Sequence, residues 1–234
     1  MRYRVLPLLV LISCIGRSQG GQPVSELLKN FERASGSFYQ FDCAKALVAA
    51  HDVSVLPNLE PWLTHKDRLA RGNAAFVFAG LGDPRGFETI VAILNDRSYS
   101  GIEGGYQMGA VLRQGRYSAA HLLGDLKDPR AVPILIKFLN DPDVNYIVPW
   151  SLGQIGDRSA IPPLIGVLGD KNPSMRVLSI YALEQLGATE ALPRLRELLD
   201  DHQKSSFDRG VTVSEAARDA ITKLESLPSS PARR

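Results

Sequence analysis

The sequence is poor in cysteine and in aromatic residues, and neither sign of charge dominates it. Its 234 residues include two cysteines, Cys14 and Cys43, which are too few for a disulfide framework or for a structural zinc site built on thiolates. The formal net charge of +2 at pH 7 is far below the strongly basic balance of a nucleic-acid-binding domain. No apolar run reaches the roughly 20 residues that a membrane-spanning helix needs. We therefore expect a globular protein with no nucleic-acid partner.

Short catalytic motifs are also missing. The sequence has no Gly-x-Ser-x-Gly, no His-Glu-x-x-His and no Ser-x-x-Lys pattern. The glycine-rich stretch at 101–105 lacks the Lys-Ser/Thr that completes a phosphate-binding loop, so we interpret it as a flexible insertion. These absences predict that the protein is not an enzyme and has no catalytic residue, no metal ligand and no cofactor.

The sequence does contain a two-helix unit that recurs along the chain. Equivalent residues of the last two units are 31 positions apart, as three pairs illustrate: Ile155 and Leu186, Pro162 and Pro193, Asp141 and Asn172. A period of this size is typical of helical repeat proteins, in which each unit buries its apolar face against its neighbours. The sequence therefore predicts an all-α solenoid.

Two residue types mark the same places in successive units. An aspartate falls in the turn between the two helices, and a proline falls near the start of the second helix: Asp52, Asp83, Asp128 and Asp157; Pro57, Pro133, Pro162 and Pro193. A carboxylate before a helix can accept hydrogen bonds from the free N–H groups of its first turn, and proline has no N–H to leave unpaired there. These residues are interpreted as helix caps and not as catalytic groups.

The units and their flanks divide the chain into segments. From the N-terminus, we predict an export signal over residues 1–20, a capping helix and linker over 21–39, the repeats over 40–201, a linker and C-terminal capping helix over 202–227, and a disordered tail over 228–234. Leu81 and Leu126 are 45 positions apart, which indicates an insertion at about 98–111. Thr212 and Glu215 form a capping-box pattern at the start of the last helix.

The first 20 residues have the pattern of an export signal. A short basic start precedes Val5–Ile12, an apolar run of eight residues. Two processing routes stay open: cleavage before Gly21, or lipidation of Cys14, because Leu11–Cys14 resembles the lipobox of bacterial lipoproteins. We expect an exported protein, periplasmic or secreted, or anchored to the membrane through a lipid on Cys14. The intact mass of the native protein would separate these routes, and an uncleaved Met1 would contradict both.

Two segments carry a resemblance to a known family. Leu81–Arg85 and Leu126–Leu135 resemble the short HEAT-like repeats that are named after phycobilisome-lyase proteins. The resemblance implies an armadillo-like superhelix of about five HEAT-like helical pairs with a capping helix at each end. Most members of this family are binding scaffolds, a few attach chromophores, and the deoxyhypusine hydroxylase branch holds two irons through His–Glu pairs. None of the four histidines here is followed by glutamate, so we predict no di-iron site.

The repeats account for nearly every distinctive residue, which favours a non-enzymatic protein-interaction scaffold with another protein as its partner. The alternative is a lyase-type accessory factor that holds a small ligand or chromophore on the solenoid. A tetrapyrrole or a metal that co-purifies with the chain would favour the alternative, and a protein recovered by pull-down would favour the scaffold.

Candidate partner-binding residues fall into three groups. Polar positions on the second helices are Arg85, Glu88, Arg130 and Lys137; arginines at one equivalent position in the first helices are Arg71, Arg116 and Arg176; aromatic residues in the insertion are Tyr99 and Tyr106. Trp150 is a further aromatic candidate, with the core as its other interpretation. The arginines have two interpretations, because a guanidinium can bind an acidic partner or pair with a carboxylate of the neighbouring repeat.

Overall fold

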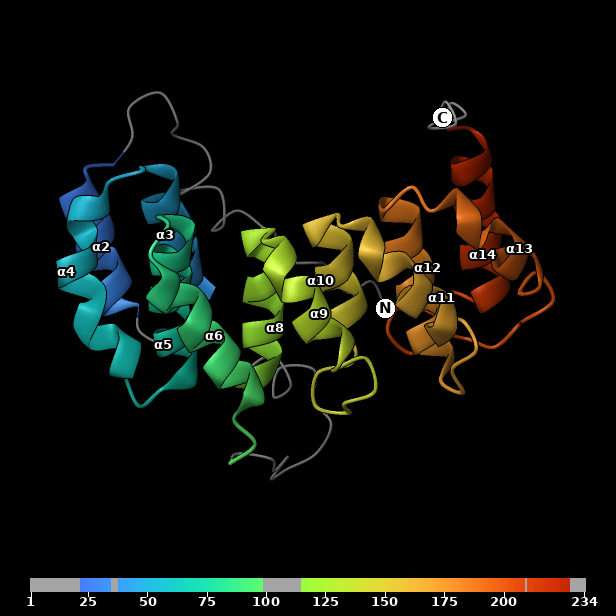
Figure 1. Cartoon of the computed structure of the whole chain (residues 1–234), viewed down its shortest axis with the longest axis horizontal. Helices are drawn as coiled ribbons and strands as arrows, with labels where there is room; N and C mark the ends of the chain where they lie inside the picture. Colours follow the sequence, from blue (N-terminus) through green and yellow to red (C-terminus); the bar gives the residue numbers. More distant parts are fainter. Residues whose placement is uncertain (1–21, 35–37, 99–114, 209, 228–234) are drawn as a thin grey trace, which may run out of the picture.

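A computed structural model describes residues 22–34, 38–98, 115–208 and 210–227. Helices follow one another in a single row from the N-terminal to the C-terminal end of the described chain (Figure 1). Within these ranges there is no strand, and Lys204 and Thr212 form an isolated antiparallel bridge. None of the described helices combines the length and the apolar character needed to cross a bilayer.

The row consists of helical pairs. The first helices of the pairs are α3 (Phe38–Ala49), α5 (Arg68–Gly80), α8 (Gly115–Leu126), α10 (Val148–Ile155) and α12 (Pro173–Gln185). The second helices are α4 (Leu56–Leu59), α6 (Pro84–Asn95), α9 (Val132–Ile136), α11 (Ile161–Val167) and α13 (Leu192–Arg196), with α2 (Val24–Arg33) and α14 (Val213–Glu225) at the two ends. The 3-10 turns η1 (Val53–Val55), η3 (Pro129–Ala131), η4 (Arg158–Ala160) and η5 (Thr189–Ala191) lead into second helices, and η2 (Glu60–Thr64) follows α4. The predicted all-α solenoid is confirmed.

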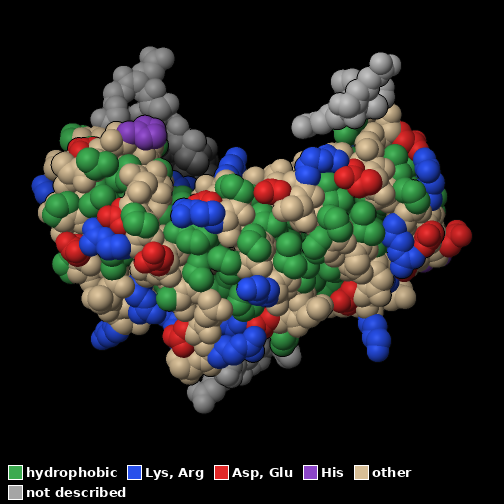
Figure 2. Space-filling model, in the orientation of Figure 1, with side chains coloured by type: hydrophobic (Ala, Val, Ile, Leu, Met, Phe, Trp, Pro, Cys, Tyr) green, Lys and Arg blue, Asp and Glu red, His purple; other side chains and the backbone are tan. Residues whose placement is uncertain are grey.

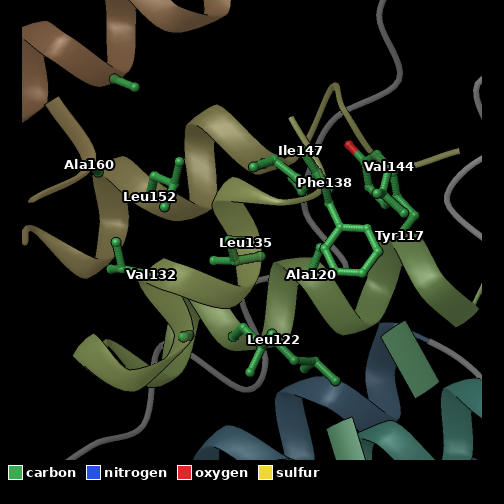
Figure 3. Packing of buried hydrophobic residues seen from close by; sticks show 14 of the residues in the cluster. Tyr117, Ala120, Leu122, Val132, Leu135, Phe138, Val144, Ile147, Leu152 and Ala160 are labelled. Carbon is green, nitrogen blue, oxygen red and sulfur yellow. The ribbon is translucent and has the colours of Figure 1, made fainter. Parts of the chain in front are cut away.

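The core lies between the layer of first helices and the layer of second helices. Each first helix contacts the next one. The second helices α6, α9 and α11 pack on the first helix of their own or the following pair, and α13 packs on α14. Figure 3 shows Leu122 of α8, Leu135 of α9 and Leu152 of α10 in this core, and all three are buried. Burying one such side chain contributes about 1.5–3 kcal/mol. One core therefore runs through all the repeats, because each unit covers the apolar face of its neighbour.

The predicted caps are confirmed. The carboxylates of the four turn aspartates accept backbone hydrogen bonds at 2.8 to 3.0 Å from the residue two positions ahead: Ser54, Arg85, Arg130 and Ser159. Thr212 and Glu215 form the predicted capping box, in which each side chain accepts from the backbone N–H of the other residue. Local sequence therefore determines where these helices begin.

The residue before each turn has a left-handed backbone, with a positive φ. In three repeats it is glycine, and in two it is not: Gly82 (88°), Gly156 (78°), Gly187 (61°), His51 (53°) and Lys127 (53°). Glycine adopts this conformation without the steric strain that a Cβ atom introduces. His51 and Lys127 are therefore exceptions to the turn chemistry of the other repeats.

Several predictions concern residues outside the described ranges. They are the export signal with Cys14, the insertion from residue 99 onward with Tyr99 and Tyr106, and the C-terminal tail from residue 228. These assignments stay predictions.

Candidate functional site

Aromatic side chains from four consecutive first helices lie side by side on one face of the solenoid. Phe41 of α3 contacts Phe76 of α5 edge-on, with ring centroids 5.2 Å apart. Phe41 also contacts His121 of α8 at 5.9 Å, and His121 stacks on Trp150 of α10 at 4.5 Å with an angle of 8° between the rings. Phe41, His121 and Trp150 are partly exposed, whereas Phe76 is buried. We call these four residues the aromatic row. The Phe41 ring lies at 79° to His121, whereas His121 and Trp150 are nearly parallel, so a flat conjugated molecule could stack on one exposed ring and contact the edges of the others.

A pocket adjoins the aromatic row between α3, α5 and α8. Its volume is about 410 Å³, and six residues line it: Lys45, Val48, Ala49, His51, Phe76 and Asp125. This volume is within the range of small-molecule sites, which is about 300–1,000 Å³. Val48, Ala49 and Phe76 supply apolar surface, while the other three side chains can form hydrogen bonds. We call this site the α3–α8 pocket.

The polar groups of the pocket are held by neighbouring charges. The Lys45 ammonium lies 2.9 Å from the Asp42 carboxylate and 4.7 Å from the centroid of the Phe41 ring. On the other wall, Asp125 Oδ2 lies 3.6 Å from His121 Nδ1, one turn earlier in α8. Burial lowers the pKa of His121, the Asp125 charge opposes that shift, and the Lys45 charge adds to it. His121 is therefore neutral at pH 7. Among the residues that line the pocket, Lys45 and His51 can donate hydrogen bonds on the α3 wall, and Asp125 can accept them on the α8 wall.

The sequence patterns pointed only in part to this site. Trp150 is among the candidates predicted from the sequence, but Phe41, Phe76, Lys45 and Asp125 are not, and the sequence raises His51 and His121 only as possible metal ligands. The sequence does contain a pattern that indicates part of this site, at one equivalent position of the repeats. The position seven residues before each turn carries Lys45, Phe76, His121, Trp150 and Tyr181 in successive repeats. Within the described residues, no cluster of three or more His, Cys, Asp or Glu side chains is arranged to hold a metal ion.

The polar residues predicted on the second helices lie in the other layer. Arg85 is paired with Glu60 at 2.6 Å and with Asp83 at 2.8 Å, and Arg130 is paired with Asp128 at 2.5 Å. Glu88 and Lys137 are exposed. Figure 2 shows hydrophobic side chains gathered over the middle of one face of the row, with charged side chains around them. Partner binding by these four second-helix residues stays a prediction.

The arginines predicted on the first helices make contacts within the chain. Arg116 is buried, and its guanidinium binds Asp141 at 2.6 Å, Asp143, and the backbone carbonyl of Leu94 at 2.9 Å. The buried Arg176 reaches the Asp201 carboxylate at 2.7 Å and donates to the Asp170 carbonyl. The half-buried Arg71 donates to the His65 carbonyl.

Of the two interpretations of these arginines, the ion pair with a neighbouring segment matches Arg116 and Arg176. Arg116 lies in α8, and it also donates to the carbonyl of Leu94 in α6 of the preceding pair, so its guanidinium links two repeats.

Two carboxylates that pair with arginines of the first helices, Asp141 with Arg116 and Asp96 with Arg68, predict a loss of stability in acid. Burial acts to raise the pKa of Asp141, but the hydrogen bonds from Arg116 and from the Asp143 backbone, with the charges of Arg116 and Arg97, lower it overall. Hydrogen bonds from Ser98, with the charge of Arg68, lower the pKa of Asp96 to about 2. Both pKa values are lowered from the roughly 3.9 of an unfolded aspartate, so the stabilisation is present above about pH 4 and is lost as the pH falls; the contribution of Asp96 is lost toward pH 2.

Urea denaturation between pH 7 and pH 2 measures this effect. We expect the free energy of unfolding to fall below pH 4, and to fall less steeply in an Asp141→Asn variant. A midpoint that stays constant or rises between pH 4 and pH 2 would contradict the role assigned to these carboxylates.

Comparisons with known proteins agree with the repeat architecture. A family model for HEAT repeats matches residues 113–164 and 140–211. The chain is 32% identical over 145 residues to the bilin biosynthesis protein PecE of Nostoc sp. (strain PCC 7120), which covers 61% of this chain and 54% of PecE. It is 33% identical over 116 residues to deoxyhypusine hydroxylase of Gallus gallus, covering 48% of this chain and 36% of that protein. The chain thus spans about half the length of PecE and less of the hydroxylase.

A solved structure is similar as well. It is the complex of CpcE and CpcF of phycocyanin lyase from Nostoc sp. PCC7120, with a TM-score of 0.53 and 26% identity over 72% of this chain and 64% of that one. The relatives are thus named as proteins of bilin biosynthesis, as a lyase and as a hydroxylase. This finding contradicts the prediction that the chain is not an enzyme. That prediction rested on missing motifs, and such motifs reveal only the few reaction types whose chemistry requires them. Residues 113–211 thus carry HEAT repeats, and the chain is similar to a bilin biosynthesis protein in sequence and to a phycocyanin lyase subunit in fold.

Proposed function

We propose that the chain is a lyase-type accessory subunit that holds a linear tetrapyrrole on the face of its first helices and works in a complex with a second protein. Two relatives support this proposal: PecE is named for bilin biosynthesis, and CpcE is solved in complex with CpcF of a phycocyanin lyase. The complex supports a protein partner, and both names support a bilin as the ligand. This proposal replaces the prediction of a non-enzymatic protein-interaction scaffold.

The geometry that carries the proposal is the aromatic row. A linear tetrapyrrole is a long conjugated system, so it can contact several aromatic side chains that follow one another along a surface. Phe41, His121 and Trp150 supply three partly exposed rings from α3, α8 and α10. Aromatic pairs contribute about 0.5–1.5 kcal/mol beyond the area that they bury.

The two layers of the solenoid could bind the chromophore and the protein partner at the same time. The aromatic row and the α3–α8 pocket lie on the first helices, whereas the predicted partner-binding residues Arg85, Glu88, Arg130 and Lys137 lie in or directly before or after the second helices. A protein bound to the second helices would therefore leave the aromatic row accessible. In this arrangement the chain presents the chromophore, and the protein partner lies in the other layer.

A titration with biliverdin, followed by its visible absorption, tests the proposal. We expect Trp150→Leu to weaken binding about 2- to 10-fold, because the loss of one stacked ring removes about 0.5–1.5 kcal/mol. Trp62→Leu is the matched control, since Trp62 also stacks on a histidine, His65, at 5.2 Å but lies outside the aromatic row. A wild-type chain that binds no biliverdin, or a Trp150→Leu variant that binds it as tightly as the wild type, would contradict the proposal.

A further inference from the structure

His51 follows α3 with a left-handed backbone, and three other repeats have glycine at this position. Its φ is 53°, and its counterparts Gly82, Gly156 and Gly187 have φ between 61° and 88°. Glycine can therefore adopt the backbone conformation of this turn. A residue with a side chain adds backbone strain there, and the fold does not require that side chain. The two exceptions, His51 and Lys127, follow α3 and α8, which are the helices that form the two walls of the pocket.

The α3–α8 pocket has hydrogen-bond donors on one wall, an acceptor on the other and apolar surface between them. Lys45 and His51 place two hydrogen-bond donors on the α3 wall, and Asp125 places an acceptor on the α8 wall. Between them Val48, Ala49 and Phe76 form an apolar surface. His51 and Lys45 are exposed, whereas Asp125 is partly buried. A purely apolar molecule would form no hydrogen bond with any of these three groups. A flat molecule with a carboxylate on one edge and N–H groups beside it would satisfy all three.

We propose that this pocket binds the acidic edge of the ligand: Lys45 and His51 donate hydrogen bonds to a carboxylate, and Asp125 accepts one from a ring N–H. The inference rests on the proposed function, because a linear tetrapyrrole carries both propionate carboxylates and pyrrole N–H groups. The pocket and the aromatic row are continuous, since Phe76 lines the pocket and contacts Phe41, and Asp125 lies next to His121. The conjugated system then extends from the pocket over Phe41, His121 and Trp150.

Biliverdin and its dimethyl ester are matched probes, because the ester keeps the conjugated system and the N–H groups but has no carboxylate. We expect the wild-type chain to bind biliverdin about tenfold more tightly than the ester, since hydrogen bonds to a charged group are the stronger ones. His51→Gly should reduce that ratio to below about threefold and leave the affinity for the ester unchanged. Asp125→Asn should weaken both ligands by the same factor.

Lys127→Gly is the control for backbone strain. Both His51→Gly and Lys127→Gly replace a left-handed non-glycine residue, so both should raise the melting temperature. Only His51→Gly removes a side chain that lines the pocket, so Lys127→Gly should keep the wild-type ratio of affinities. If His51→Gly lowers the melting temperature instead, Lys45→Gln serves as the second variant, and it must reduce the same ratio for the inference to stand.

The outcomes separate this inference from the proposed function. Equal affinities of the wild-type chain for biliverdin and for the ester would overturn the inference and leave the proposed function in place. A wild-type ratio that persists in both His51→Gly and Lys45→Gln would do the same. A wild-type chain that binds neither probe would overturn the proposed function, and the inference with it.

Discussion

Replacement of Arg116 by methionine is expected to destabilise the protein by about 3–5 kcal/mol, because it leaves a buried carboxylate without its partner. The side chains of Arg116 and Asp141 are 3% and 4% exposed, and their charged atoms lie 2.6 Å apart. Methionine fills a similar volume but supplies no charge and no donor. The Asp141 carboxylate would then remain away from water with only the more exposed Arg97 to compensate it. Urea denaturation at pH 7 measures the difference.

Arg97→Met is the matched control for this prediction. Arg97 binds the same carboxylate of Asp141 at 2.7 Å, but its own side chain is 66% exposed. Because Arg97 is exposed and the Asp141 carboxylate keeps its buried partner Arg116 in this variant, it should lose far less stability. Equal losses from Arg116→Met and Arg97→Met would show that burial of the pair has no special effect. An Arg116→Met, Asp141→Asn double variant should be less destabilised than the sum of the two single variants, because the unpaired charge is gone.

Replacement of Gly86 by alanine is expected to cost about 3 kcal/mol of stability, at the upper end of typical overpacking. A Cβ atom at this position of α6 would lie 2.2 Å from the backbone nitrogen of Ala79 and 2.3 Å from the backbone oxygen of Ala75. Both atoms belong to the backbone of α5, so no change of a side-chain rotamer can relieve the contact. The helices α5 and α6 would have to separate, and α5 carries Phe76 of the pocket.

Gly166→Ala is the control for Gly86→Ala, because it makes the same change in another second helix. A Cβ atom on Gly166 would have no neighbour within 4 Å, and the residue lies inside α11. Alanine restricts the unfolded chain more than glycine does, so this variant should gain about 0.5–1 kcal/mol. Thermal or chemical denaturation of the two variants side by side gives both values. A Gly86→Ala variant that is as stable as the wild type would contradict the close packing of α6 on the backbone of α5.

Local sequence determined the fold class and the ends of many helices. The turn aspartates could be identified as caps because each accepts from a backbone N–H only two residues ahead, as Asp83 does from Arg85. The capping box of Thr212 and Glu215 spans three residues. Interactions of this range depend on little beyond the identity and spacing of neighbouring residues. The 31-residue period then implied that such units stack, because one unit alone cannot bury its apolar face.

Only the tertiary structure decided which residues of different repeats meet. Asp141 is 25 residues from Arg116, and His121 is 29 residues from Trp150, yet each pair is in contact. The sequence places Arg71, Arg116 and Arg176 at one equivalent position, but it does not show whether they bind a partner or form ion pairs between repeats. The exposure of their guanidinium groups decides this, and that exposure depends on how the repeats pack. The α3–α8 pocket likewise needs the distance and angle between α3 and α8, which the 14 inserted residues between α6 and α8 obscure in the sequence. Capping energies act within one turn of helix, whereas a site between repeats depends on the stacking geometry of whole units.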